Sequence, residues 1–483
     1  MLVFNSLTQK KTKITKNKNK PLKIFVCGPT VYDYPHIGNA RPFLFFDSFV
    51  KYLKSQGFKV FYLQNITDID DKIIKKAKEQ KTTWKKISSY FEKIYHQNEK
   101  ALNITSVNKY ARATKHIKEI EEQIKLLIKN GLAYEIQNDG IYFDISRFPN
   151  YGQLSKRDYK SAEDASSRIE ENPNKKNKGD FVLWKFAKKG EPFWNLSFGA
   201  GRPGWHIEDT AISVKYFGPQ YDIHGGGIDL KFPHHEAEIA QAEGAYQKRP
   251  FVKIWMHTGQ LLVNGEKMSK SLGNFITIQD FLKKNEPEVL RLMVLLHQWR
   301  APINFTEEVL SSTTYTWKNL KNFLLKLDFI IKQKSQDNFK LSNLKPINSN
   351  LIKSKIKLLN KEVKLALNDD FNTPQALGQI FTFLNQIEKN IWQIDVKDII
   401  LIQAAIYTHL QSIGLEIKND YKIPSSIRFL LQKRELFRRN KQFMQADLLR
   451  NKIKALGYII EDTPIGPFVI QENYAQKRNS KPA

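Results

Sequence analysis

The stretch Ile-Phe-Val-Cys-Gly-Pro-Thr-Val-Tyr-Asp-Tyr-Pro-His-Ile-Gly-Asn, residues 24–39, decides the fold of this chain of 483 residues. Its apolar start, residues 24–26, predicts a buried strand, and the glycine-proline pair at Gly28 predicts a turn. An amphipathic segment over residues 41–55 predicts a helix. A strand, a glycine-bearing turn and a helix N-terminus together favour phosphate binding, because unpaired N–H groups and the helix dipole point outward there.

The only cysteine, Cys27, follows the first strand directly. Because ligands of open α/β sheets bind at the carboxyl ends of the strands, we expect Cys27 at a ligand site. A second apolar run, residues 59–63, completes a strand–helix–strand unit, which favours a parallel, doubly wound sheet. Acidic residues in the next segment, residues 67–71, would cap the following helix or help to hold a substrate.

The charge balance is strongly basic, with 77 Lys and Arg against 49 Asp and Glu and a net charge of +28. Such an excess suggests a polyanionic partner, most simply nucleic acid, although a lysine-rich composition would produce the same excess. A single cysteine excludes an internal disulfide framework and fits a reducing cytoplasm. Residues 1–20 lack the apolar core of a signal peptide, and no apolar run approaches the ~20 residues that cross a membrane.

Changes of pattern along the chain predict its organisation. Residues 84–130 have helical spacing of apolar side chains, whereas residues 133–184 consist of short β-like pieces and a polar loop, which suggests an insertion. Residues 281–417 are nearly all helical in pattern. At the end of the chain, a strongly basic helix over residues 428–456 precedes a short β-like tail.

Two lysines lie on a loop of small residues, Glu-Lys-Met-Ser-Lys-Ser-Leu-Gly-Asn at 266–274. The flexible ammonium groups of Lys267 and Lys270 can follow phosphate charge as it develops. The structural alternative is a solvated basic loop. The tetrapeptide His-Ile-Gly-Asn at residues 36–39 is by itself short enough to recur by chance.

Possible metal ligands gather in residues 201–209 and 224–238, where four of the ten histidines lie between positions 206 and 235. His234 and Glu238 are four residues apart, so on a helix they share a face and can bind one ion. A purely structural role would account for one or two of these histidines.

The two phosphate motifs, in this order and about 230 residues apart, resemble the HIGH and KMSKS signatures of class I aminoacyl-tRNA synthetases. Their context is similar to the cysteinyl-tRNA synthetases over essentially the full chain. The matching segments are Cys27-Gly-Pro-Thr-Val-Tyr-Asp, Asn65-Ile-Thr-Asp-Ile-Asp-Asp, Asp180-Phe-Val-Leu-Trp-Lys, Gly201-Arg-Pro-Gly-Trp-His-Ile-Glu, His224-Gly-Gly-Gly, Phe232-Pro-His-His-Glu, Asp369-Asp-Phe-Asn-Thr-Pro, and the tail from Ala446 to Pro464.

The resemblance implies an α/β fold of the class I synthetases: a Rossmann-like, doubly wound parallel sheet with an insertion domain, then an all-α helical bundle and a small C-terminal domain. We expect the catalytic domain at 1–105 and 194–250, the connective insertion at 106–193, the KMSKS loop and stem-contact region at 251–312, the helical bundle at 313–417, and the anticodon-binding domain at 418–483.

The resemblance also implies a reaction in two steps. Cysteine is activated with ATP to cysteinyl-adenylate and then transferred to the 3'-terminal ribose of tRNA-Cys. The implied partners are ATP with Mg²⁺, L-cysteine and tRNA-Cys, in a monomer in the cytoplasm. His36, Gly38 and Asn39 would bind the ATP phosphates, and Lys267 and Lys270 would stabilise the transition-state charge, so that His36, Asn39 and the two lysines form the catalytic set.

For the amino acid, the resemblance implies contacts from five residues. Trp205 would form a wall of the pocket, Asp229 would pair with the substrate ammonium group, and the others would surround the substrate. The implied cysteine-binding set is Cys27, Thr67, Trp205, His224 and Asp229.

In that family one zinc ion per chain is held by two cysteines, a histidine and a glutamate and binds the substrate thiolate. The matching residues here are Cys27, Asp209, His234 and Glu238, so an aspartate stands where the family has its second cysteine. Zinc accepts an oxygen donor at ~2.0–2.2 Å in place of sulfur at ~2.3 Å, so we expect the ion to be retained. The alternative is an absent or loosely held ion, with selectivity from pocket shape alone; His206, Glu208 and His235 are possible substitute ligands.

Two other functions fit parts of the sequence. A ligase joining cysteine to an amino-sugar would use the same adenylate chemistry, but a small acceptor needs no tRNA-sized basic surface. A non-catalytic tRNA-binding paralogue would not need the intact motifs around His36 and Lys267. For RNA contact, Trp317 and the basic face of residues 428–454 are candidates through charge and stacking.

Overall fold

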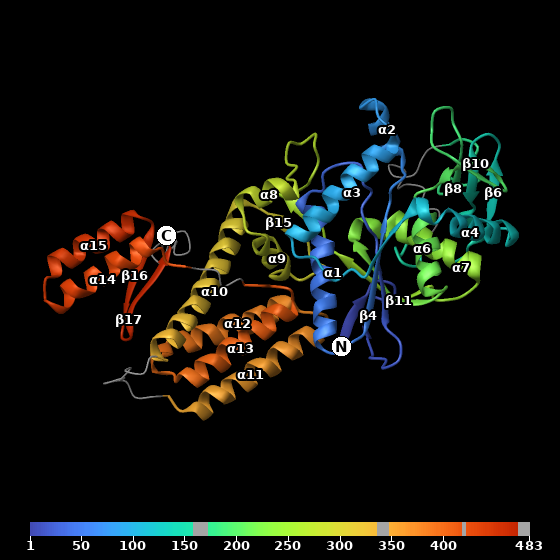
Figure 1. The fold of residues 1–483 in the computed structure, drawn as a ribbon. Coiled ribbons are helices and arrows are strands. Elements are labelled where there is room, and N and C mark those ends of the chain that lie inside the picture. The colour runs from blue at the N-terminus through green and yellow to red at the C-terminus, as the bar shows by residue number, and fades with distance from the viewer. Residues whose placement is uncertain (158–171, 336–346, 418–421, 472–483) are drawn as a thin grey trace. The chain divides into compact units, whose positions relative to one another are not determined.

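The computed structural model describes residues 1–157, 172–335, 347–417 and 422–471 (Figure 1). Parts of the expected insertion, helical bundle and C-terminal domain, at 158–171, 336–346, 418–421 and 472–483, lie outside the described residues. The chain divides into two compact units. The first comprises Met1–Pro287, His297–Phe305 and Asn368–Phe371, and the second comprises Glu288–Leu296, Thr306–Leu367 and Asn372–Ala483.

A five-stranded sheet with all its neighbouring strands parallel forms the centre of the first unit (Figure 1). This confirms the doubly wound parallel sheet expected from the sequence. Helices connect the strands, since α1 (Ile37–Ser55) follows the central strand, and α6 (Ile207–Phe217) and α7 (Glu236–Tyr246) flank β11 in the chain. The strand order is β12 (Val252–Thr258), β11 (Tyr221–Gly227), β3 (Leu22–Val26), β4 (Val60–Ile66) and β5 (Lys109–Arg112).

Alternation along β3 determines where the cysteine side chain points. Successive residues of a strand point to opposite faces, and Phe25 and Cys27 both belong to one buried apolar cluster. The same cluster contains Ile212 of α6 and Ile239 of α7. The sulfur of Cys27 is therefore directed toward α6 and α7, which carry the candidate metal ligands Asp209 and Glu238.

The helical pattern predicted over residues 84–130 is wrong at its centre. Helices α3 (Trp84–Ala101) and α4 (Ile117–Lys129) are present, but β5 lies between them and pairs in parallel with β4. At four residues β5 is too short for periodicity to separate it from the flanking helices. The sheet thus includes β5 and β12, which lie just outside the ranges 1–105 and 194–250; the domain ranges stay a prediction.

A second, antiparallel sheet in the first unit follows α4; three of its strands lie within the range 106–193 expected for the insertion, and its other two lie just beyond it. Its order is β6 (Ala133–Ile136), β7 (Gly140–Phe143), β8 (Phe181–Phe186), β10 (Gly199–Pro203) and β9 (Trp194–Leu196). The remaining elements of this unit are the hairpin β1 (Leu2–Asn5) and β2 (Lys10–Lys13), the small sheet of β13 (Leu261–Val263), β14 (Glu266–Lys267) and β15 (Ile303–Phe305), and helices α2 (Asp71–Glu79) and α8 (Ile278–Lys284).

Helices make up most of the second unit, and none of its described helices, nor any in the first unit, is long and apolar enough to span a membrane. The single basic helix expected at 428–456 is in fact two helices, because the chain turns at Lys441, whose φ is 59°. The described elements are α9 (Pro287–Leu295), α10 (Glu307–Lys334), α11 (Ser349–Asn368), α12 (Thr373–Glu388), α13 (Val396–Ser412), α14 (Ser425–Arg439), α15 (Phe443–Ala455), and the hairpin of β16 (Tyr458–Thr463) and β17 (Gly466–Gln471).

Candidate active site

The N-terminus of α1 is capped by two of the predicted phosphate-binding side chains. The backbone N–H of Asn39 donates to Nδ1 of His36 at 3.2 Å, and the backbone N–H of His36 donates to Oδ1 of Asn39 at 3.1 Å. Because Nδ1 accepts a hydrogen bond, the neutral ring carries its proton on Nε2. Burial, with a further contribution from Lys267, lowers the pKa of His36 to about 4, so the ring is neutral near pH 7.

Gly38 allows the lysine loop to approach this helix end closely. A Cβ atom at Gly38 would lie 2.6 Å from Cε of Met268 and 2.9 Å from the His36 ring. The backbone N–H of Ile37 also donates to the carbonyl of Ile276 at 3.0 Å, just beyond the loop. The two motifs, far apart in the sequence, are therefore adjacent in the structure.

Each lysine of the loop 266–274 faces a carboxylate. The Nζ atom of Lys267 lies 4.0 Å from Oδ2 of Asp229. Lys270 forms an ion pair with Asp33, and Asp33 also pairs with Lys76 of α2 at 3.0 Å. Burial alone would raise the pKa of Asp33, but hydrogen bonds from the two lysines bring it below its ordinary value.

The phosphate motifs and Cys27 line one cavity of about 990 Å³ in the first unit. The predicted site residues that line it are Cys27, His36, Gly38, Asn39, Trp205, Asp229, Lys267 and Lys270. Thr67 and His224 are buried instead: Thr67 bonds to Glu208, and Nδ1 of His224 lies 2.6 Å from the hydroxyl of Tyr221. Their contacts to a substrate stay a prediction.

The acidic segment after β4 has a structural role as well. Asp70 caps α2, because its carboxylate accepts a hydrogen bond from the backbone N–H of Lys72 at 2.8 Å. Both residues also line the cavity. The two alternatives considered for residues 67–71, a helix cap and a wall of the substrate site, are thus compatible at Asp70.

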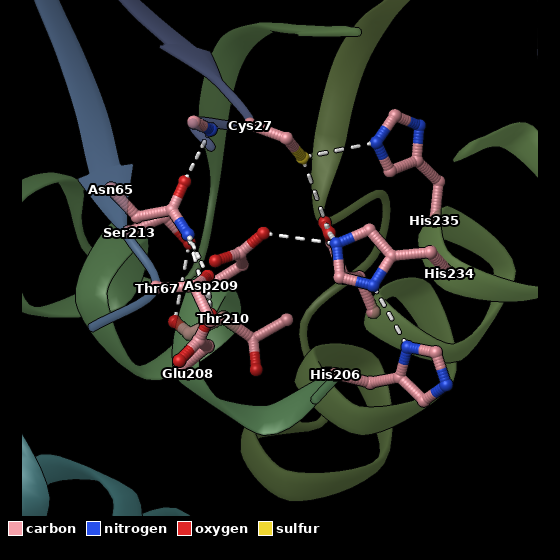
Figure 2. A network of polar contacts seen from close by, with 12 residues as sticks. Cys27, Asn65, Thr67, His206, Glu208, Asp209, Thr210, Ser213, His234 and His235 are labelled. Atoms are coloured by element: carbon pink, nitrogen blue, oxygen red, sulfur yellow. Dashed lines mark hydrogen bonds and ion pairs between the residues drawn. The ribbon is translucent and has the colours of Figure 1, made fainter. Parts of the chain in front are cut away.

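Four buried side chains converge beside the cavity (Figure 2). The sulfur of Cys27 lies 3.1 Å from Nε2 of His235 and 3.7 Å from Oε1 of Glu238, and Nε2 of His234 lies 2.9 Å from the same Glu238 oxygen. The ligand atoms of these four residues all lie within 4.8 Å of one another. Sulfur, imidazole and carboxylate donors at these spacings form a group that suits a metal ion.

Asp209, from the first turn of α6, reaches the same cluster. Its Oδ2 atom lies 3.0 Å from Nε2 of His234, whereas Oδ1 is buried and has no hydrogen-bond partner in the described structure. His235, in contrast, has contacts at both ring nitrogens, since Nδ1 lies 2.8 Å from Nε2 of His257. A buried, unpaired carboxylate oxygen is destabilising, and a cation beside it would remove that penalty.

The electrostatics of the cluster favour a positive charge at its centre. Burial raises the pKa of the Cys27 thiol well above its ordinary value, and the carboxylates of Glu238 and Asp209 raise it further. Burial would lower the pKa of His234, but the same two carboxylates raise it to about 10. The residues present therefore fit a divalent cation, which would be bound by the thiolate and carboxylate forms of these ligands.

Comparison with known proteins identifies the family. The family described as "tRNA synthetases class I (C) catalytic domain" matches residues 13–315, and the DALR domain matches residues 362–414. Cysteine–tRNA ligase from Caldicellulosiruptor saccharolyticus is 38% identical over 96% of this chain and 98% of that protein. Cysteine–tRNA ligase from Methanococcus maripaludis is 40% identical over 96% and 97%. The chain belongs to the cysteine–tRNA ligase family. This confirms the recognition made from the sequence and the expected class of enzyme, an aminoacyl-tRNA ligase.

Solved structures of other synthetases share the fold. Methionyl-tRNA synthetase from Mycobacterium tuberculosis in complex with methionyl-adenylate aligns with a TM-score of 0.59 at 13% identity, covering 82% of this chain and 90% of that one. The leucyl-tRNA synthetase of Agrobacterium radiobacter, in a ternary complex, aligns with a TM-score of 0.55 at 11% identity, covering 82% and 86%. The class I synthetase fold expected from the sequence is thus confirmed for this member of the cysteine–tRNA ligase family.

Sequence reasoning missed two charged residues in this family member, one that lines the cavity and one that is hydrogen-bonded to a residue of its wall. Asp33 lies within the first motif, and its ion pair with Lys270 becomes apparent only in the structure. Arg41, in the first turns of α1, is fully buried, and its guanidinium donates to the carbonyls of Gln260 and Trp299. One feature of the sequence could have indicated this role of Arg41. The apolar spacing of α1 places this charged residue on the buried face of the helix.

Proposed function

We propose that this member of the cysteine–tRNA ligase family charges tRNA-Cys with cysteine in two steps at the cavity described above. The carboxylate of cysteine attacks the α-phosphorus of ATP, the bond to pyrophosphate breaks, and a terminal ribose hydroxyl of the tRNA then takes the aminoacyl group. No side chain of the protein forms a covalent bond in this scheme. Catalysis rests on position and electrostatics.

The HIGH-like and KMSKS-like segments handle the phosphates. The neutral His36 ring donates from Nε2 to a phosphate oxygen, and Asn39 holds that ring at the helix N-terminus through the reciprocal cap. Lys267 and Lys270 stabilise the negative charge that develops on the departing pyrophosphate. Gly38 keeps the space in which the loop and the helix end meet. Mg²⁺ accompanies ATP as its counter-ion.

Residues around Cys27 hold the amino acid. We assign Cys27, Asp209, His234 and Glu238 as the ligands of one Zn²⁺, with Asp209 preferred over His235 because its Oδ1 atom lacks a partner. Zinc bound there supplies a Lewis acid that favours a thiolate over a hydroxyl, which would discriminate cysteine from serine. Trp205 stacks on His234 at 4.6 Å and lines the cavity, so it would form the wall beside the substrate.

Asp229 and two buried residues complete the proposed cysteine site. Asp229 lies on the cavity wall, where its carboxylate would pair with the ammonium group of the substrate. Thr67 and His224 would act from behind the wall, His224 through its contact at 3.2 Å to the sulfur of Cys27. The tRNA would be attracted by the net charge of +28. We further propose that the protein acts as a cytoplasmic monomer.

One observation carries this proposal: Cys27 and both phosphate motifs line a single cavity next to a buried cluster of metal-binding side chains. The test is ATP–pyrophosphate exchange by the purified chain with cysteine and with serine, with zinc measured on the same preparation, followed by charging of tRNA-Cys. We expect cysteine-dependent exchange, one zinc per chain and tRNA charging. Metal-free protein with full cysteine selectivity would contradict the zinc assignment, and exchange without charging would contradict the tRNA partner.

A further inference from the structure

Asp33 stands out among the charged groups of the cavity because it binds a residue of the proposed catalytic set. Its carboxylate forms ion pairs with Lys270 of the loop 266–274 and with Lys76 of α2. It lines the same cavity as His36 and Lys267. The ammonium group that should bind the pyrophosphate moiety is therefore engaged by a carboxylate of the protein.

The two sides of this ion pair differ in freedom. Asp33 is held in place, since its Oδ1 atom accepts a hydrogen bond from the backbone N–H of Tyr34 at 2.9 Å and its side chain is only 17% exposed. The side chain of Lys270 is 62% exposed and lies on a loop of small residues. Lysine carries its charge on a flexible stem with several rotatable bonds. Lys270 is thus the partner that can leave.

Lys76 makes that departure possible at low cost. Its side chain is 19% exposed. Because Lys76 lies on α2 and not on the loop 266–274, a movement of the loop leaves its ion pair with Asp33 intact. When Lys270 moves to a phosphate oxygen, the carboxylate therefore keeps one counter-ion and is not left unpaired in a half-buried position. The triphosphate of ATP carries several negative charges against one on Asp33, so it outcompetes the carboxylate for the ammonium group.

We propose that Asp33 is a positioning residue that holds Lys270 at the cavity wall, releases it to the phosphates of ATP, and binds it again when pyrophosphate leaves. This inference rests on the proposed function, because it concerns the same lysine. It adds a second binding partner for Lys270. The carboxylate of Asp33 and the phosphates of ATP would then compete for the same ammonium group. Removing the carboxylate should then strengthen nucleotide binding, but only while Lys270 is present.

The test is a double-mutant cycle on ATP binding by the full chain with Mg²⁺, measured by equilibrium dialysis. Asp33→Asn is isosteric and removes the competing charge; it should tighten ATP about threefold, the size of a partly exposed ion pair. In the Lys270→Met background the same change should leave the ATP dissociation constant unaltered. Asp369→Asn, which removes an exposed carboxylate paired with Lys11, is the matched control and should leave ATP binding unchanged.

Two results would overturn the inference. Equal tightening with and without Lys270 would mean that Asp33 acts only through its general negative charge. Weaker ATP binding by Asp33→Asn would mean that the carboxylate supports the site. The proposed function is tested by a different assay. Wild-type protein without cysteine-dependent pyrophosphate exchange would contradict that function, whereas the double-mutant cycle on ATP binding would still test the role of Asp33.

Discussion

Asp209 stands at the position where the resemblance to the cysteine–tRNA ligase family leads us to expect a cysteine. An oxygen ligand in place of sulfur would keep the formal charge of the proposed ligand set, because carboxylate and thiolate are both monoanions. It would give a bound metal ion a harder and less electron-donating environment. The buried, unpaired Oδ1 atom of Asp209 marks the direction from which a cation would be bound.

Substitution of Asp209 should separate the metal's role from that of pocket shape. Asp209→Ala removes one ligand and should lower zinc content well below one per chain and weaken discrimination against serine by about tenfold, whereas Asp209→Cys should retain the ion. Metal analysis and exchange with the two amino acids measure both effects. Full zinc occupancy in Asp209→Ala, with loss of the ion in His235→Ala, would assign the fourth ligand to His235.

Gly38 gives a second test at the scale of one residue. A methyl group there meets Cε of Met268 at 2.6 Å and the His36 ring at 2.9 Å, so Gly38→Ala should displace the loop or the ring. We expect pyrophosphate exchange to fall about 100-fold while the fold is retained, because small errors in position are costly in catalysis. Met268→Ala should restore part of the loss, since it removes the Cε atom that the new methyl group would meet. Unchanged exchange in Gly38→Ala would show that the close approach is unnecessary.

Long segments with a clear hydrophobic period could be predicted from the sequence. Short strands, helix breaks and contacts between distant residues could not. The strand before Cys27, helix α1 and the β-like tail follow from periodicity. Strand β5 does not, because four residues carry too little pattern, and the break at Lys441 occurs within uniformly basic sequence. The contacts of Asp33 with Lys270 and of Arg41 with Gln260 join positions more than 200 residues apart, beyond the reach of any local rule.

Helix α3 contains a pH-dependent contact that can be checked independently of activity. Hydrogen bonds to Glu92 and Glu99 raise the pKa of His96 from its ordinary value to about 9. A histidine with a raised pKa stabilises the fold fully below its unfolded-state pKa of ~6.5, and this stabilisation is lost as the pH rises through about 9.

His96→Gln should therefore lower the urea midpoint at pH 6 and have a much smaller effect at pH 9.5. Unfolding curves of both proteins at the two pH values measure the difference, and Lys85→Gln, on the same helix, serves as a control without such a dependence. An equal loss at both pH values would show that the neutral ring, and not its charge, matters.

At the scale of the whole molecule, the candidate active site and the basic C-terminal helices belong to different compact units. The cavity and the candidate metal cluster of Cys27, His234, His235 and Glu238 belong entirely to the first unit. The second unit contains α14 and α15 and the hairpin of β16 and β17, joined by ion pairs from Asp462 to Arg434 at 2.8 Å and to Arg438 at 2.7 Å. Adenylate formation and tRNA binding should therefore respond to different substitutions.

Asp462→Ala should reduce tRNA charging without reducing adenylate formation. Without the carboxylate, the buried Arg434 loses its main partner and the hairpin loosens from α14. We expect tRNA charging to fall about tenfold, equivalent to ~1.4 kcal/mol of RNA binding, with pyrophosphate exchange unchanged. Parallel assays of the two activities measure this. Equal loss of both would contradict the division between the units.

The solitary thiol of this chain makes the site directly countable. Cys27 is free, buried and the single sulfhydryl in 483 residues, so any alkylating reagent that modifies the protein at a thiol modifies it there. Burial raises the pKa of this thiol, so a small iodoacetamide should label the folded chain slowly, whereas unfolding exposes the same single thiol to the reagent. Mass spectrometry of the intact chain would then follow one labelling event per molecule as the site opens, with no background from other thiols.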